Sequence, residues 1–199
     1  MRLWRILTLT FPMLLVSMTA CGTVDKRVDP DVNDGVGGGG IESGDVRAMA
    51  SSFSRDILAW PALFQGGQNP SLYISELKNE SSTVINKTIV LKQIQTALVR
   101  NSNGKVACID RTQEGMEAIM RERKAKREGA VSSSGNKELM GSDYIMKGTI
   151  QSIEKRGKDL KSAYFSITME LTDLESGRIV WASPVYEFKW VGEKAAIYQ

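Results

Sequence analysis

The chain contains no histidine among its 199 residues. This absence excludes Ser–His–Asp triads, Cys–His dyads and the most common zinc sites, because all of them need an imidazole. Cysteine is also scarce, since only Cys21 and Cys108 occur. After the first 20 residues, no apolar run approaches the roughly 18 residues that a membrane-spanning helix needs. We therefore predict no histidine-based catalysis and no cofactor.

A large excess of one charge is missing as well. The sequence has 26 basic and 23 acidic side chains, which gives a formal net charge of +3. Proteins that bind nucleic acid through its phosphates usually carry a much larger basic excess. We therefore expect no nucleic-acid partner.

The amino-terminal segment has the pattern of a bacterial secretion signal. Arg2 and Arg5 precede an apolar stretch over residues 6–16, which is too short for a comfortable membrane span. Small residues follow and lead directly to Cys21. This arrangement resembles the lipobox of bacterial lipoproteins, and the resemblance implies that residues 1–20 are removed and that Cys21 carries acyl chains. The alternative is an ordinary secretory signal with Cys21 merely near the cleavage site.

The residues after Cys21 predict where the protein is held. In lipoproteins, an Asp after the acylated cysteine favours the inner membrane, so Gly22 implies a lipid anchor in the outer membrane that faces the periplasm. Residues 21–43 are predicted to form a flexible, Gly-rich tether. Fully stretched, a tether of this length reaches at most about 70 Å. If Cys21 is acylated, Cys108 has no disulfide partner, and we interpret it as a small core residue rather than a reactive thiol.

The remaining residues, 44–199, are predicted to form one globular domain. Helical periodicity covers residues 45–60, 86–101 and 112–128. Alternation typical of strands covers residues 71–77, 106–109, 143–153, 162–174 and 178–189. Pro184 interrupts the last strand and predicts an edge position or a bulge. Residues 78–83 are predicted to be a polar loop, and residues 137–140 a short helical turn.

This order of elements predicts the fold class. It indicates an α/β (α+β) domain with a single mixed β-sheet flanked by helices. Two tight connections near the carboxyl end predict a three-stranded antiparallel meander. In the third helix, Met116, Ile119 and Met120 are expected to face inward.

The end of the third helix is highly charged. The run Arg121–Glu128 holds five basic and two acidic residues. The simpler interpretation is a solvated helix end, where cations also suit the helix dipole. The second is a docking patch for an acidic protein surface or an anionic wall polymer.

Motifs for catalysis or cofactor binding are weak. Residues 35–40 match the glycine spacing of a dinucleotide-binding loop, but an acidic tail precedes them where a strand is required. Glu76, Glu170 and Asp173 are carboxylates that a wall-cleaving enzyme could use, yet carboxylates at strand edges are usually solvated. We therefore predict that the chain is not an enzyme and has no small-molecule substrate.

Several stretches of the sequence together resemble a known family. In order along the chain, these stretches are Asn33–Asp34, Ser43–Asp45, Pro70–Ser82, Asn103–Val106, Gly141–Ile150 and Leu171–Trp181. The last two stretches are the most specific. From about residue 33 to 191, the chain is similar to the penicillin-binding-protein activator LpoB family. Related CsgG-like and TolB N-terminal domains share part of the final hairpin pattern.

The resemblance implies a fold and a function. The fold would be similar to the TolB N-terminal domain. The function would be to bind and stimulate a bifunctional peptidoglycan synthase, a class A penicillin-binding protein, as a monomer or with weak self-association. The residues we predict to contact this partner are Asn79, Glu80, Arg121, Arg123 and Lys124. The alternative is a self-assembling structural or secretion-associated envelope lipoprotein of the CsgG-like type.

Overall fold

The computed structural model describes residues 29–30, 40–67, 69–135, 137–158 and 160–193. Cys21, the predicted signal segment and most of the predicted tether lie outside the described residues. Within the described part of the chain, no helix is long and apolar enough to cross a membrane.

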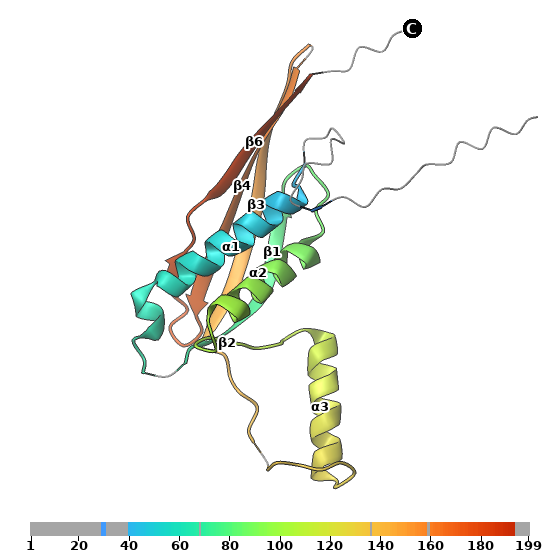
Figure 1. The fold of residues 1–199 in the computed structure, drawn as a ribbon, viewed down its shortest axis with the longest axis vertical. Coiled ribbons are helices and arrows are strands. Elements are labelled where there is room, and N and C mark those ends of the chain that lie inside the picture. Colours follow the sequence, from blue (N-terminus) through green and yellow to red (C-terminus); the bar gives the residue numbers. More distant parts are fainter. Residues whose placement is uncertain (1–28, 31–39, 68, 136, 159, 194–199) are drawn as a thin grey trace, which may run out of the picture.

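One six-stranded mixed sheet organises the domain (Figure 1). Its strands are β1 (Ser71–Glu80), β2 (Ala107–Cys108), β3 (Tyr144–Arg156), β4 (Leu160–Asp173), β5 (Ile179–Ala182) and β6 (Tyr186–Glu193). Their order across the sheet is β2-β1-β3-β4-β5, and β6 also pairs with β4. β1 runs parallel to β2 and β3, whereas β4 runs antiparallel to β3, β5 and β6. The predicted mixed sheet and carboxyl-terminal antiparallel meander are confirmed. The predicted last strand is divided around Pro184 into β5 and β6, because proline has no backbone N–H to donate.

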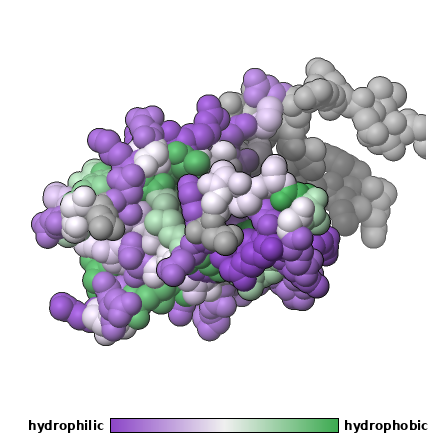
Figure 2. Space-filling view, turned by 90° about the horizontal axis from the view of Figure 1, so that it is seen from below, coloured by the Kyte–Doolittle hydropathy of each residue, from purple (hydrophilic) through white to green (hydrophobic). Residues whose placement is uncertain are grey.

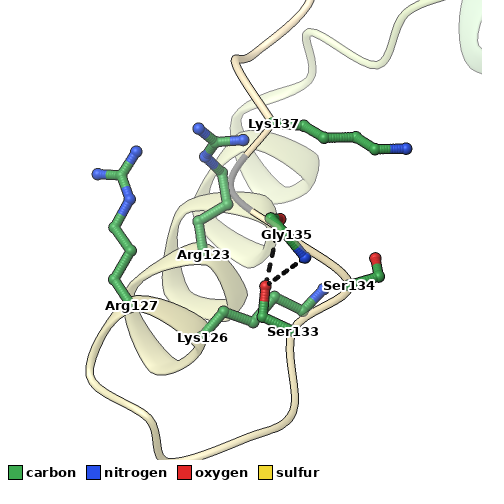
Figure 3. A pocket seen from close by; sticks show the side chains of 7 residues that line it. All are labelled: Arg123, Lys126, Arg127, Ser133, Ser134, Gly135 and Lys137. Atoms are coloured by element: carbon green, nitrogen blue, oxygen red, sulfur yellow. Dashed lines mark hydrogen bonds between the residues drawn. The ribbon is translucent and has the colours of Figure 1, made fainter.

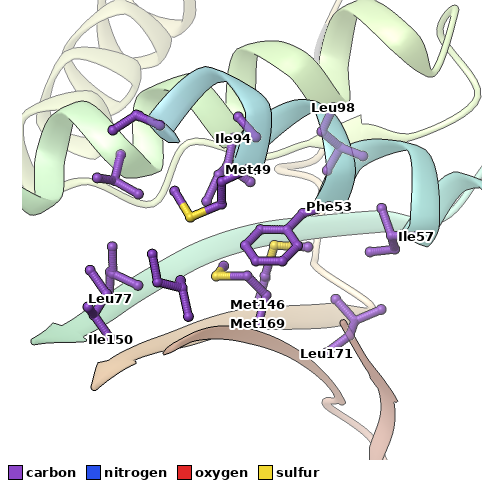
Figure 4. Packing of buried hydrophobic residues seen from close by; sticks show 14 of the residues in the cluster. Met49, Phe53, Ile57, Leu77, Ile94, Leu98, Met146, Ile150, Met169 and Leu171 are labelled. Atoms are coloured by element: carbon purple, nitrogen blue, oxygen red, sulfur yellow. The ribbon is translucent and has the colours of Figure 1, made fainter. Parts of the chain in front are cut away.

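Two helices cover one face of this sheet. α1 (Ser43–Ala59) begins with a capping box between Glu42 and Asp45. A short 3₁₀ helix, η1 (Pro61–Phe64), follows α1. α2 (Lys87–Asn101) begins where the Asn86 side chain accepts a hydrogen bond from the backbone N–H of Ile89. Both helices lie over β1, β3 and β4, so we call this the inner face of the sheet (Figures 1 and 4).

The core lies between these helices and the inner face (Figure 4). Met49, Phe53 and Ile57 of α1 meet buried residues of all three central strands. Phe53 also makes an edge-to-face contact with Tyr186, with ring centroids 6.4 Å apart. Gly148 lets this layer close, since a Cβ there would overlap the Met169 sulfur. Burial of this apolar surface is what holds the sheet and helices together.

Two local predictions are corrected. Residues 78–80 belong to β1 rather than to a polar loop, because Lys78 and Glu80 pair with Thr149 and Gln151 of β3. Pairing with a long neighbour overrides the polar composition of this stretch. Residues 137–140 form no helical turn, and Met140 is held instead by a hydrogen bond from Arg111 to its carbonyl oxygen, at 2.7 Å.

Candidate functional site

A helical arm projects from one end of the domain (Figure 1). It consists of residues 110–140, of which position 136 lies outside the description, and contains α3 (Gln113–Arg127). α3 has no buried residue, and the side chain of Met120 is 55% exposed. The prediction that Met116, Ile119 and Met120 face the core is therefore wrong. The inner face is already filled by α1 and α2, so the short apolar stripe of α3 has no core surface left to cover.

The base of the arm is fixed by local hydrogen bonds. The Asp110 carboxylate accepts hydrogen bonds from the hydroxyl and the backbone N–H of Thr112, and these bonds lower the pKa of Asp110. Thr112 in turn caps α3 by accepting a hydrogen bond from the N–H of Gly115. Arg111 lies within 3.5 Å of the Met116 sulfur and also binds the carbonyl of Met140. The two ends of the arm are thus joined where it leaves the sheet.

α3 presents cations on two different sides. At 100° per residue, Arg123, Lys126 and Arg127 share one side and Arg121 lies opposite them. Lys124 lies between Arg121 and Arg127. Lys124 forms an ion pair with Glu128 at 3.8 Å, and Lys126 forms one with Glu122 at 3.5 Å. Exposed pairs of this kind contribute little stability. Within the described residues, the guanidinium groups of Arg121, Arg123 and Arg127 have no ion-pair partner.

The side of α3 that carries Arg123 faces a hollow (Figure 3). The segment that returns from α3 forms the opposite wall of this hollow. The lining residues are Arg123, Lys126, Arg127, Ser133, Ser134, Gly135 and Lys137, and none of them is acidic. We call this space the arm hollow. Sequence reasoning missed it, although the spacing of Arg123 and Lys126 before a serine-rich return was a signal that could have indicated it.

The end-on view shows the surface around the arm (Figure 2). Hydrophilic side chains dominate this end of the molecule, and small apolar areas lie between them. A second hollow of about 320 Å³ on α3 includes Met120 and Leu139, which are both exposed. Its other lining residues are charged, namely Arg123, Lys124, Arg127 and Glu128. The arm therefore offers mainly charged contacts with a few apolar ones, which is the composition of an interface rim.

Asn79 and Glu80 lie far from the arm. β1 starts beside β2, where the arm begins, and ends at Glu80. The Asn79 amide donates to the carbonyl of Thr83 at 2.8 Å, and its oxygen accepts from Ser81, so it shapes the loop after β1. The structure therefore divides the five predicted contact residues between two ends of the domain.

Glu80 is held by its neighbours in the sheet. Lys78 forms an ion pair with Glu80 at 2.6 Å, and Gln151 donates a hydrogen bond to it at 3.0 Å. These interactions, chiefly the one with Lys78, lower the pKa of Glu80. Its carboxylate is thus already partnered on the exposed face of the sheet.

The three carboxylates considered for catalysis do not converge. Lys147 pairs with both Glu76 and Glu170 in the sheet register and so lies between them. Glu170 and Asp173 are three positions apart on β4, so their side chains point to opposite faces. Asp173 accepts hydrogen bonds from the backbone N–H groups of Ser176 and Glu175, and its pKa is lowered mainly by Ser176. A general acid needs a raised pKa instead.

Cys108 sits at the short strand β2. Its side chain is partly buried and packs against the core. Burial raises the pKa of the Cys108 thiol to about 11. Because the thiolate is the nucleophile, this environment suits a packing role better than a reactive one.

Comparison with known proteins decides the family. The family model described as peptidoglycan-synthase activator LpoB matches residues 45–185 of this chain. The chain belongs to the LpoB family. The match includes strands β1 to β5, nearly all of α1, the whole of α2 and the whole arm, and it ends just before β6. The resemblance predicted from the sequence is confirmed.

The solved structures that match this chain include LpoB C-terminal domains from two bacteria. The LpoB C-terminal domain from Salmonella enterica is 13% identical, with 75% of this chain and 99% of that chain covered and a TM-score of 0.42. The corresponding domain from Escherichia coli is 13% identical, with 72% and 98% covered and a TM-score of 0.45. The PelC dodecamer from Paraburkholderia phytofirmans is 16% identical, with 63% and 74% covered and a TM-score of 0.30. A comparison with curated proteins gave no match.

Proposed function

We propose that this LpoB-family chain is an outer-membrane lipoprotein that binds and stimulates a class A penicillin-binding protein. The family match over residues 45–185 carries this proposal, because the family is named for the activation of a peptidoglycan synthase. The lipobox-like segment before Cys21 supports the anchor and the periplasmic orientation. In this role the chain acts by binding, and the reacting groups belong to the synthase.

The arm is placed well for reaching a partner. The amino end of α1 lies at the end of the domain where β1 finishes, and Gly40 lies close to Thr83 there. The tether thus joins the domain at one end, and the arm projects from the other (Figure 1). Because the tether attaches at the opposite end of the domain, it leaves the arm free to contact a partner.

We propose that the side of α3 with Arg121 and Lys124 contacts an acidic surface of the synthase. Both side chains are exposed, and Arg121 has no ion-pair partner among the described residues. Charges at such a surface raise the association rate and fix the orientation of the partner. The other three predicted contacts are less central to this proposal. Asn79 and Glu80 lie at the end of the domain that joins the tether, and Arg123 faces the arm hollow.

The double variant Arg121→Gln/Lys124→Gln is expected to bind the synthase about tenfold more weakly, which corresponds to about 1.4 kcal/mol. The loss should appear mainly in the association rate, and it should shrink in high salt. Surface plasmon resonance with an immobilised class A penicillin-binding protein measures both rates. A polymerisation assay with the same proteins shows whether stimulation falls in parallel.

The matched control is Lys155→Gln/Arg156→Gln. It removes the same two charges, also from exposed positions, but at the end of β3 near the tether. We expect the control to bind the synthase within about twofold of the unchanged chain. Failure of the unchanged chain to bind any class A synthase, or to change its rate, would refute the proposed function.

One observation favours the alternative of self-assembly. β2 pairs with Ser71 and Leu72 of β1, and residues 73–80 of this ten-residue strand have no strand partner on that side in the described part of the chain. Such an open edge can pair with a strand of another copy. Light scattering of the chain from residue 22 onward tests this. We expect a monomer mass up to high micromolar concentration, and a defined ring or multimer would favour self-assembly instead.

A further inference from the structure

The lining of the arm hollow contains four basic residues and no acidic one. Arg123 and Lys126 come from α3, and Lys137 comes from the returning segment (Figure 3). Lys126 is paired with Glu122 outside the lining, whereas Arg123 has no ion-pair partner among the described residues. Like charges that line one hollow repel one another, and an anion bound there would relieve that repulsion. The hollow is therefore complementary in charge to an oxyanion.

Hydrogen-bond donors in the hollow fit the same ligand. The Ser133 hydroxyl donates to the carbonyl of Gly135 and accepts from its N–H, both at 3.2 Å, and these bonds hold the return in a fixed turn. Figure 3 shows the Lys126 side chain running toward Ser133 and Ser134, while Arg123 extends toward the segment that carries Lys137. Ser134 adds a hydroxyl to the lining. The Ser133 hydroxyl is already used in this turn, so the donors left for a phosphate are the Arg123 guanidinium, the lysine ammonium groups and the Ser134 hydroxyl.

The size of the hollow limits what can enter. Its volume is about 150 Å³. Since a water molecule occupies about 30 Å³ in the liquid, this space holds the equivalent of about five waters. A single phosphate group with a little bound water fits, whereas a folded acidic segment does not.

We propose that the arm hollow is a binding site for a phosphate group, held chiefly by Arg123 and Lys126. This site is distinct from the proposed synthase contact, because neither Arg121 nor Lys124 lines the arm hollow. The phosphate can belong to a membrane lipid headgroup, which is a phosphodiester, or to a soluble phosphate monoester, since both present anionic phosphate oxygens.

The test titrates glycerol phosphate into the chain from residue 22 onward, which keeps every described helix and strand. Chemical shifts of the Ser133, Ser134 and Gly135 amides and of the Arg123 Nε report on the site. We expect saturable shifts with a dissociation constant on the order of 1 mM. Binding should weaken between pH 7.5 and 5.5, because a phosphate monoester loses its second charge near its pKa of about 6 while Arg and Lys stay charged.

Two matched variants distinguish binding at the arm hollow from a general effect of the positive charge of the arm. Arg123→Gln/Lys126→Gln and Arg121→Gln/Lys124→Gln each remove one Arg and one Lys, and each breaks one ion pair within α3. We expect the first to weaken glycerol phosphate binding at least tenfold and the second to change it by less than about twofold. Equal loss in both variants, or no saturable binding by the unchanged chain, would overturn the proposal.

A second measurement identifies the source of the phosphate. Vesicles of phosphatidylcholine with and without about one third phosphatidylglycerol are mixed with the same three chains and sedimented. Preference for the anionic vesicles that disappears only in Arg123→Gln/Lys126→Gln supports a lipid headgroup. Glycerol phosphate binding without a preference between the vesicles supports a soluble ester.

Discussion

A Cys21→Ser variant, exported behind an ordinary cleavable secretory signal, is expected to move from the membrane fraction to the soluble periplasm. Each buried CH₂ of an acyl chain contributes about 0.8 kcal/mol, and a single myristoyl chain binds only with a constant of about 10⁴ M⁻¹. Several chains on one cysteine therefore hold a protein on its membrane. Among the described residues, no helix is long and apolar enough to take over this role.

The matched control for this change is Cys108→Ser, which alters the only other cysteine. Cys108 belongs to the folded domain, so the control should remain in the membrane fraction. Mass spectrometry of the purified chain should show acyl groups on its amino-terminal peptide. Recovery of the Cys21→Ser variant with the membrane, or a Cys21 thiol free of fatty acid, would contradict the proposed anchor.

The Cys21→Ser variant should also show whether the anchor affects stimulation of the synthase directly or only through the location of the protein. Purified Cys21→Ser protein should stimulate a synthase in solution about as well as the anchored form, because the described domain and arm are intact. In cells we expect weaker stimulation, since the tether no longer confines the domain near the synthase at a high effective concentration. The rate of glycan polymerisation with purified proteins measures the first expectation, and the rate of wall labelling in cells measures the second.

Replacing Ile150 by alanine is expected to lower the free energy of unfolding by about 2–5 kcal/mol. Ile150 lies on the inner face of β3 and is 0% exposed, between the strand residues Asn79 and Ile167. Removing its outer carbon atoms loses apolar burial and leaves a cavity that the two covering helices cannot fill. Urea unfolding of the chain from residue 22 onward, followed by circular dichroism, measures the change.

Ile153 provides the matched comparison three residues further along the same strand. Its side chain is 61% exposed. Ile153→Ala should therefore change the free energy of unfolding by less than about 0.5 kcal/mol. If Ile150→Ala does not fold, Ile150→Val should still fold and lose about 0.5–1.5 kcal/mol. Similar losses from Ile153→Ala and Ile150→Ala would mean that both faces of β3 are covered, which would contradict the arrangement in Figure 1.

Much of the fold follows from local pattern. Val46, Met49, Phe53 and Ile57 recur at helical spacing, and all four are buried against the sheet. The alternation along β4 likewise identifies its inner face, because neighbouring side chains of a strand point to opposite sides. These periodicities are properties of a short segment, so they can be read without knowing its neighbours.

The arm shows where local pattern is insufficient. Met116, Ile119 and Met120 have the spacing of a core-facing stripe, yet α3 buries no residue. Whether a stripe is buried depends on whether a free apolar surface remains for it, and α1 and α2 already occupy the inner face. The extension of β1 to Glu80 has the same origin, because polar residues join a strand when β3 offers them hydrogen-bond partners.

By itself, the sequence determined the mixed sheet, its helical cover and the likeness to the LpoB family, and it excluded histidine chemistry. Only the tertiary structure decided that Asn79 and Glu80 lie at the opposite end from Arg121, and that the serine-rich return folds back to form a hollow with Arg123 and Lys126. The physical reason is the distance along the chain over which each kind of information acts. Periodicity and residue type act within a few neighbouring positions, whereas the distance between two functional groups depends on how the whole chain packs.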